Sequence, residues 1–135
     1  MSRETQHRAK KWVLAKLVDR VFEADQKVRF VGVYQEQYML AGGMRHGRRS
    51  ADPEEEAVEI DLKLAKMGGT ATAWQKWFGD LRGFAIRYDK VSLAFIPLGG
   101  DRFLVLSTDA DLDPFTVVEK LRKDEEFGQL AEAVP

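Results

Sequence analysis

Glycine and arginine residues between positions 42 and 49 are of the types that bind anions. Gly42 and Gly43 precede Arg45, Arg48 and Arg49. Glycine amides and guanidinium groups together can hold a phosphate, so this loop is a candidate anion-binding site of a small-ligand sensor. The spacing of a phosphate-binding loop is absent, and the lysine that should follow its second glycine is missing. The interpretation we favour is an exposed polar loop whose arginines neighbour the acidic segment 52–56.

A second cluster contains carboxylates that could bind a hard cation. Asp109, Asp111 and Asp113 alternate along the chain, as acids do at the opening of a calcium loop. Pro114 stands where such a loop needs glycine, and Lys120 stands where it needs a bidentate glutamate. The segment is therefore interpreted as a solvated loop whose last aspartate caps a helix, and no metal is expected.

The other reactive side chains do not form a catalytic set. The chain has no cysteine, and its two histidines, His7 and His46, have no sequence neighbours at metal-ligand or triad spacing. Both histidines are expected to be solvated. Because no base, nucleophile and orienting group can be assembled, we predict that the protein is not an enzyme and uses no cofactor.

The charge balance argues against nucleic acid as a partner. Among 135 residues, 21 are basic and 22 acidic, which gives a net charge of −1. No global field therefore attracts polyanions, and the basic residues beside Trp12 are interpreted as a solvated face. No apolar run approaches the length of a membrane span or a signal-peptide core. We expect a single cytoplasmic domain over residues 1–135.

The first half of the chain predicts a helix followed by a hairpin. Apolar residues at three- and four-residue steps predict a helix over 8–24. Runs rich in β-branched and aromatic residues at 28–34 and 38–41 predict two strands, which Gly42 and Gly43 are expected to end. Asp52 and Pro53 then supply the cap and the first-turn proline of a second helix.

The second helix contains a glycine pair, Gly68 and Gly69, which would normally end it. The helical phase nevertheless continues across the pair, so one long helix reaching Leu81 is predicted. The stripe expected to face the core consists of Ala57, Ile60, Leu64, Met67, Ala71, Trp74, Phe78 and Leu81. Trp77 lies off this stripe, either under a loop or at an interface, and the sequence leaves both open.

The second half predicts a three-stranded meander and a last helix. Strands are expected at 84–88, 91–98 and 102–108, and Asp113 with Pro114 begins a helix that fades into the acidic tail. The last two strands are apolar on both faces, so helices must cover both sides of the sheet. The predicted class is α/β (α+β), with a five-stranded, largely antiparallel sheet. The expected element order is helix, two strands, helix, three strands, helix, with the long helix on one face and two on the other.

This element order over residues 13–121, with an opening strand at Arg29, Phe30, Val31, Gly32 and Val33, resembles the roadblock/longin group of profilin-like domains. The group includes dynein roadblock light chains, prokaryotic regulators of small GTPases and uncharacterised archaeal proteins. The resemblance implies a homodimer that forms through helix 2 and the third strand. It also implies a scaffold or adaptor role without chemistry, with a small GTPase or another protein as partner.

A stripe of small residues on the second helix gives an independent reason to expect self-association. Ala65, Gly69 and Ala73 recur at four-residue spacing, and small side chains let another helix approach closely. In the alternative interpretation the stripe packs within the monomer, or the glycine pair breaks the helix. The candidate dimer interface comprises Val58, Leu62, Ala65, Gly69, Ala73, Phe84, Ile86 and Tyr88.

Overall fold

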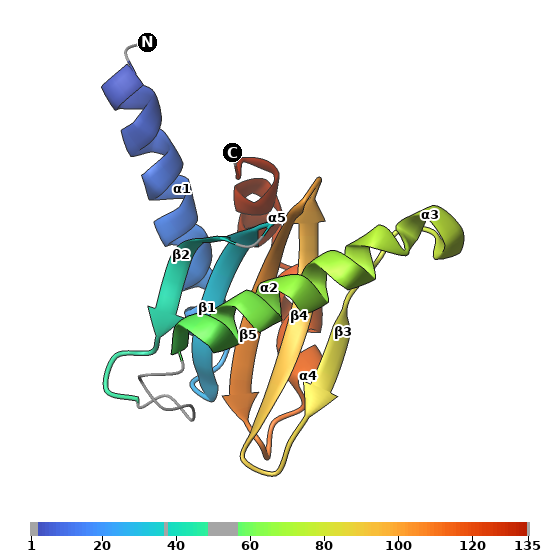
Figure 1. Cartoon of the computed structure of the whole chain (residues 1–135). Helices are drawn as coiled ribbons and strands as arrows, with labels where there is room; N and C mark the ends of the chain where they lie inside the picture. The colour runs from blue at the N-terminus through green and yellow to red at the C-terminus, as the bar shows by residue number, and fades with distance from the viewer. Residues whose placement is uncertain (1–2, 37, 49–56, 135) are drawn as a thin grey trace.

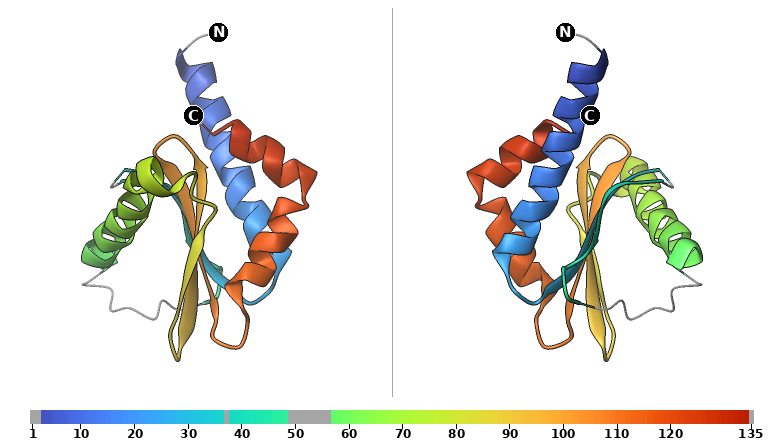
Figure 2. Two further views of the ribbon diagram at one scale, coloured as in Figure 1. Left: turned by 90° about the vertical axis from the view of Figure 1, so that its right-hand side faces the viewer. Right: turned by 90° about the vertical axis from the view of Figure 1, so that its left-hand side faces the viewer.

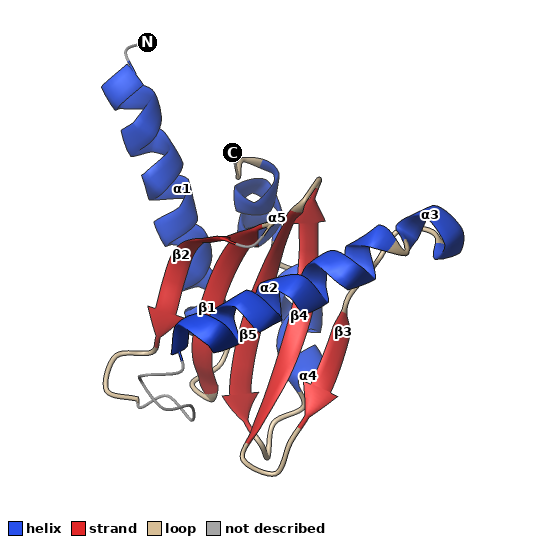
Figure 3. Ribbon diagram, in the orientation of Figure 1, coloured by secondary structure: helices blue, strands red, loops and turns tan. Residues whose placement is uncertain are grey.

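The computed structural model describes residues 3–36, 38–48 and 57–134, without the side chains of 3–10, 57, 58 and 61. It is a mixed α/β domain (Figures 1 and 3). The elements are α1 (Arg3–Ala24), β1 (Val28–Gln35), β2 (Tyr38–Met44), α2 (Ala57–Ala73), α3 (Gln75–Phe78), β3 (Phe84–Arg87), β4 (Val91–Gly99), β5 (Arg102–Asp109), α4 (Pro114–Arg122) and α5 (Glu125–Glu132).

All five strands form one antiparallel sheet. Its strand order is β2-β1-β5-β4-β3, so β2 and β3 are the two edges. The two hairpin-forming halves of the chain meet through β1 and β5, which pair along most of their length. The predicted five-stranded antiparallel sheet is confirmed.

Helices cover both faces of the sheet, as the apolar strands require. Figure 2 shows α2 on one face and α1, α4 and α5 on the other. The face under α1, α4 and α5 holds the larger core, and a smaller, mainly aromatic core lies under α2. The predicted division of helices between the faces is confirmed, except that α5 adds a third helix to the second face.

The acidic tail does not fade as predicted, because α5 has a capped start and a buried face. The side chain of Asp124 accepts hydrogen bonds from the backbone N–H groups of Glu126 and Phe127. Phe127 and Leu130 are buried in the larger core. Two apolar positions among acids give a weak periodic signal, so only the packing against α1 reveals this helix.

Helix α2 is continuous through the glycine pair, as the helical phase predicted. It does not reach Leu81, because it ends at Ala73 and a turn at Trp74 separates it from the four-residue helix α3. Gly79 follows α3 with a φ of 90°, a conformation that glycine adopts without strain and that stops the helix. The predicted start at Asp52 and Pro53 lies outside the described residues.

Strand β2 runs through Gly42 and Gly43 to Met44, so the prediction that these glycines end the hairpin is wrong. Gly42 has a φ of 127°, and a Cβ there would collide with the backbone of Val31. Strand β2 therefore contains Gly42 because a residue with a side chain would not fit this close to the backbone of β1.

Candidate functional site

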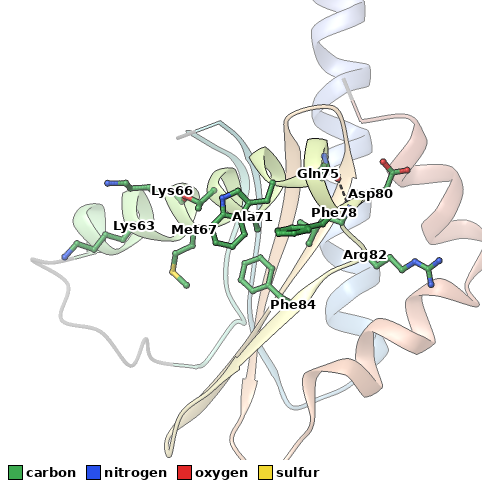
Figure 4. Close-up of a pocket in the computed structure, with 13 residues that line it drawn as sticks. Lys63, Lys66, Met67, Ala71, Gln75, Phe78, Asp80, Arg82 and Phe84 are labelled. Atoms are coloured by element: carbon green, nitrogen blue, oxygen red, sulfur yellow. Dashed lines mark hydrogen bonds between the residues drawn. The ribbon is translucent and has the colours of Figure 1, made fainter.

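An open groove lies at the β3 edge of the sheet. Its volume is about 940 Å³, and it lies between the α2–α3 rod and β3 (Figure 4). The lining is mostly apolar, with Lys63 and Lys66 at one end and the loop after α3 at the other. The residues that form the apolar surface are Met67, Ala71, Trp74, Phe78, Leu81 and Phe84.

The groove exists because α2 packs on the sheet through its smallest residues. Ala65 is only 2% exposed, and Gly68 is buried against the ring of Phe103. A Cβ on Gly68 would lie 2.6 Å from that ring, so only glycine permits this approach. Contact through this narrow stripe turns the larger apolar side chains of α2 toward the sheet edge.

The predicted core stripe is therefore wrong at its C-terminal half. Met67 is 36% exposed, Trp74 50% and Phe78 80%. These side chains lie along the flank of the α2–α3 rod and line the groove. Periodicity identified an apolar stripe correctly, but its C-terminal half faces an open edge, whereas Leu64 in its first half packs against the protein's own core. The groove is thus a surface that another molecule could cover.

A row of aromatic rings under α2 leads across the sheet to the groove. Tyr34 stacks on Phe103 with centroids 5.3 Å apart, and Phe103 lies 6.4 Å from Phe95. Phe95 in turn stacks on Phe84 at 4.3 Å. Phe84 ends the row at the edge strand, where it is half-buried and lines the groove. The groove floor is therefore continuous with the aromatic core.

Helix α3 lies beyond the edge strand β3 (Figure 1), and its aromatic residues are exposed. None of its residues is buried, and Trp77 is 66% exposed with the Nζ of Lys76 4.5 Å from its ring centroid. The side-chain oxygen of Gln75 accepts a hydrogen bond of 2.8 Å from the backbone N–H of Leu81, which holds the following loop. The exposure of Trp77 excludes the interpretation that it lies under a loop.

The structure divides the predicted interface residues of the second helix. Ala65 packs into the protomer's own interior, which contradicts its place on an outward-facing stripe. Leu62 is 48% exposed, and Gly69 and Ala73 are also exposed. The side chain of Val58 lies outside the described residues. The small residues of the stripe therefore do not share one environment. Ala65 packs against the protein's own sheet, whereas Gly69 and Ala73 face solvent.

The predicted interface residues of the third strand lie at the sheet edge. Phe84 and Ile86 are half-buried and pack in the aromatic core under α2. Tyr88 follows the strand and is 58% exposed. Strand β3 pairs with β4 and ends the strand order, so its other side is an open edge beside the groove.

Arg45 is not available to bind an anion, because its guanidinium group holds the end of α1. Its Nε donates to the carbonyl of Val28 at 2.7 Å, and one terminal nitrogen donates to the carbonyls of Phe22 at 2.6 Å and Asp25 at 2.8 Å. The group also lies 5.0 Å from the centroid of the Phe22 ring. It satisfies carbonyls that the helix end leaves without partners.

The other two predicted anion ligands give the site no support. Arg48 forms an ion pair with Asp109, which also lies 3.7 Å from Arg29. Arg49 lies outside the described residues. Backbone carbonyls and a carboxylate from distant segments already engage the guanidinium groups of Arg45 and Arg48, so these two residues lend the anion-binding prediction no support.

The aspartates of the 109–113 segment form ion pairs or cap a helix. Asp111 pairs with Lys27 at 2.6 Å, which lowers the pKa of Asp111 and raises that of Lys27. Asp113 caps α4 by accepting from the N–H of Phe115. Within the described residues no group of acids, histidines or cysteines could hold a metal ion. His46 is exposed, and the side chain of His7 lies outside the description.

Solved structures share this fold over almost the whole chain. The gliding protein MglB from Thermus thermophilus is 15% identical with a TM-score of 0.69, and the match covers 92% of each chain. An MglB with a tetrameric arrangement is 16% identical with a TM-score of 0.65, covering 90% of each chain. A roadblock/LC7 domain from Streptomyces avermitilis is 13% identical with a TM-score of 0.58, covering 91% of this chain and 92% of that one.

The chain therefore has the roadblock/longin fold, as the element order indicated. No family model matches the sequence, and no curated protein matches it. Among the described helices, none is both long and apolar enough to cross a membrane.

Proposed function

We propose that this chain is a non-enzymatic, cytoplasmic interaction module that forms a homodimer through the groove and the open edge of β3. The observation that carries the proposal is the exposure of Trp74, Trp77 and Phe78 beside the open edge of β3. Clusters of exposed aromatic residues of this kind mark interaction surfaces in soluble proteins.

A second copy of the chain could cover the exposed aromatic residues and pair with the open edge of β3 at the same time. Pairing of β3 with its symmetry mate satisfies the open backbone groups and extends the sheet. A two-fold axis beside β3 then places each α2–α3 rod over the other copy's groove, because the rod already extends past the edge strand. The tetrameric MglB structure supports self-association as a property compatible with this fold.

The proposed interface differs from the one that the sequence alone suggested. Met67, Trp74 and Phe78 supply exposed apolar side chains to it, whereas Ala65 is excluded because it is buried in its own protomer. Phe84 remains at the centre, since it joins the groove to the aromatic core. Leu62, Gly69, Ala73 and Tyr88 are exposed but do not line the groove.

The dimer would act by presenting a two-fold surface to another protein. The resemblance to roadblock-type regulators suggests a small GTPase as that partner. No enzymatic step is assigned, because the groove is apolar and its charged residues lie at its ends. The alternative function, an anion sensor, has no support in the described residues since Arg45 and Arg48 are already engaged.

The self-association can be tested by measuring mass with light scattering after size exclusion. The natural chain should have a mass of about twice 15.4 kDa. The double variant Trp74→Glu, Phe78→Glu should be a folded monomer, because two buried charges without partners would cost more than the interface gains. Circular dichroism checks that the variant is folded.

The matched control is Trp12→Glu, which changes a tryptophan of similar exposure on α1. This control should keep the mass of the natural chain. A monomeric natural chain, or a double variant that remains dimeric, would contradict the proposed interface. The partner class is tested by a pull-down from the native cell, in which the natural chain should enrich a small GTPase and the double variant should not.

A further inference from the structure

The opposite edge of the sheet is long and lacks the residues that normally protect an edge strand. Strand β2 is the terminal strand on this side and runs for seven residues, Tyr38–Met44. It contains no charged residue and no proline, although proteins commonly place these on edges to prevent pairing with other chains. The other edge, β3, has four residues and includes Arg87. The β2 edge is therefore chemically suited to accept another strand.

The backbone groups that would pair with an added strand can be identified from the register. Arg45 donates its N–H to the carbonyl of Arg29, so this pair is hydrogen-bonded toward β1. Hydrogen-bonded and non-hydrogen-bonded pairs alternate along antiparallel strands. The backbone groups of Ala41 and Gly43 therefore point toward β1, and those of Gly42 and Met44 point to the open edge. Only another extended backbone offers donors and acceptors at this spacing.

A groove of about 480 Å³ lies beside this edge, between β2 and α1. Leu14, Val18 and Phe22 of α1 and Leu40 of β2 give it an apolar lining. The space beside Gly43 is empty, because a Cβ at that position would meet nothing within 4 Å. A strand added at the edge would project every second side chain into this groove.

Two opposite charges at the groove define the order of charges in the occupant. Lys11 and Asp19 both line it, eight residues apart on α1, which corresponds to about 12 Å along the helix. A strand covers that distance in about four residues, so side chains at positions 1, 3 and 5 share one face and span the groove. Lys11 would pair with an acid and Asp19 with a base, on either side of an apolar residue.

The direction of the added strand follows from the direction of β2. Arg45 comes directly after β2 and reaches the carbonyl of Phe22 near the end of α1, so the two elements run the same way. Asp19 therefore lies toward the Met44 end of β2, and Lys11 lies toward its start. An antiparallel strand, the commoner arrangement, would meet Asp19 first and Lys11 last.

We propose that the β2 edge and the α1 groove bind an extended segment of a partner protein as an antiparallel sixth strand. The segment carries a basic residue, an apolar residue and an acidic residue at alternate positions, in that order. Backbone pairing with Gly42 and Met44 supplies affinity, and Lys11, Asp19 and the groove supply specificity. This surface is separate from the proposed dimer interface at β3 and does not depend on it.

The probe for this proposal is a fluorescently labelled heptapeptide with blocked ends. It has valine at its centre, lysine two residues before, glutamate two residues after, and threonine elsewhere. The natural chain should bind it, and hydrogen exchange at the amides of Gly42 and Met44 should slow on binding. The control peptide has the same composition with the two charged residues each moved by one position, onto the opposite face, and should bind at least about tenfold more weakly.

The charge order is tested with the double variant Lys11→Glu, Asp19→Lys. This variant should lose at least about tenfold in affinity for the first peptide and regain it for a peptide with lysine and glutamate exchanged. A second variant, Ala15→Trp, fills the groove from an exposed position and should abolish binding of the first peptide.

Three results would overturn the proposal: no binding of the first peptide, binding without slowed exchange at Gly42 and Met44, or affinities that ignore the charge order. Preference of the natural chain for the exchanged peptide would overturn the antiparallel direction. Light scattering gives the dimer mass independently, so failure of peptide binding and failure of self-association are distinguishable.

Discussion

At the scale of single residues, charged side chains join segments that are distant in the sequence. Asp124 caps α5, and its carboxylate also accepts two hydrogen bonds from the guanidinium group of Arg20 on α1, at 2.5 and 3.1 Å. The hydrogen bond from Arg20 and the N–H groups at the helix start lower the pKa of Asp124, and the same pair raises the pKa of Arg20. The charged form of Asp124 is thus favoured by folding.

The lowered pKa of Asp124 predicts a specific pH dependence of stability. A carboxyl whose folded pKa is depressed stabilises the fold above its unfolded pKa of about 3.9, and the contribution is lost as pH falls through the folded value. Asp124→Asn should therefore lower the melting temperature at pH 7, and its difference from the natural chain should shrink as the solution is acidified below the folded pKa. Thermal unfolding followed by circular dichroism across this pH range measures both effects.

The control for this prediction is Asp89→Asn, which neutralises an exposed aspartate elsewhere. Its melting temperature should follow that of the natural chain at every pH. A deficit of Asp124→Asn that stays constant down to low pH would show that the ion pair and the charged cap do not contribute as described.

At the scale of elements, the two adjacent glycines of α2 have opposite environments. Gly68 is buried against Phe103, whereas a Cβ on Gly69 would meet nothing within 4 Å. Neither has a backbone conformation that requires glycine, since both lie within the helix. Gly68 is therefore retained for close packing, and Gly69 has no such role within the protomer.

Alanine at these two positions should change stability in opposite directions. Gly69→Ala should raise the free energy of unfolding by about 0.5–1 kcal/mol, because alanine favours the helix and restricts the unfolded chain. Gly68→Ala should lower it by about 1 kcal/mol, because overpacking against Phe103 exceeds the same gain. Urea unfolding measures the free energy of unfolding of both variants, and each variant serves as the control for the other. Equal effects at both positions would contradict the helix orientation described here.

At the scale of the whole molecule, the sheet has two different edges. The β3 edge is short and lies beside the large apolar groove under the α2–α3 rod, and we assign it to a second copy of the chain. The β2 edge is longer and lies beside a smaller groove with charged ends. A dimer formed through β3 would leave both β2 edges free at the two ends of a continuous sheet, where they remain able to bind partner strands.

Self-association should make thermal stability depend on protein concentration. Because a partner that binds only the folded state stabilises it by mass action, each tenfold rise in concentration should raise the melting temperature of the natural chain by about 2–3 °C. The melting temperature of the Trp74→Glu, Phe78→Glu variant should not change with concentration. Calorimetry over a hundredfold concentration range distinguishes the two, and a natural chain without any concentration dependence would contradict the dimer.

The sequence by itself determined the order of the elements apart from α3 and α5, the antiparallel sheet and the continuity of α2 through Gly68 and Gly69. These features depend on local periodicity, on caps such as Asp113 and on apolar strands, all of which are written within short segments. The same local reasoning, together with the resemblance, pointed to the second helix and third strand as an interface, but it placed Ala65 on the outward face of that helix, where the structure has it buried.

Tertiary structure alone decided which helix face meets the sheet and which arginines are occupied. Gly68 packs on Phe103, and Arg45 binds carbonyls at the end of α1, so both outcomes depend on partners far away in the chain. An apolar stripe shows that a helix has a side to bury, but not whether its own sheet or another molecule covers it. Close packing at Gly68 settled that choice and left Trp74 and Phe78 at an open edge.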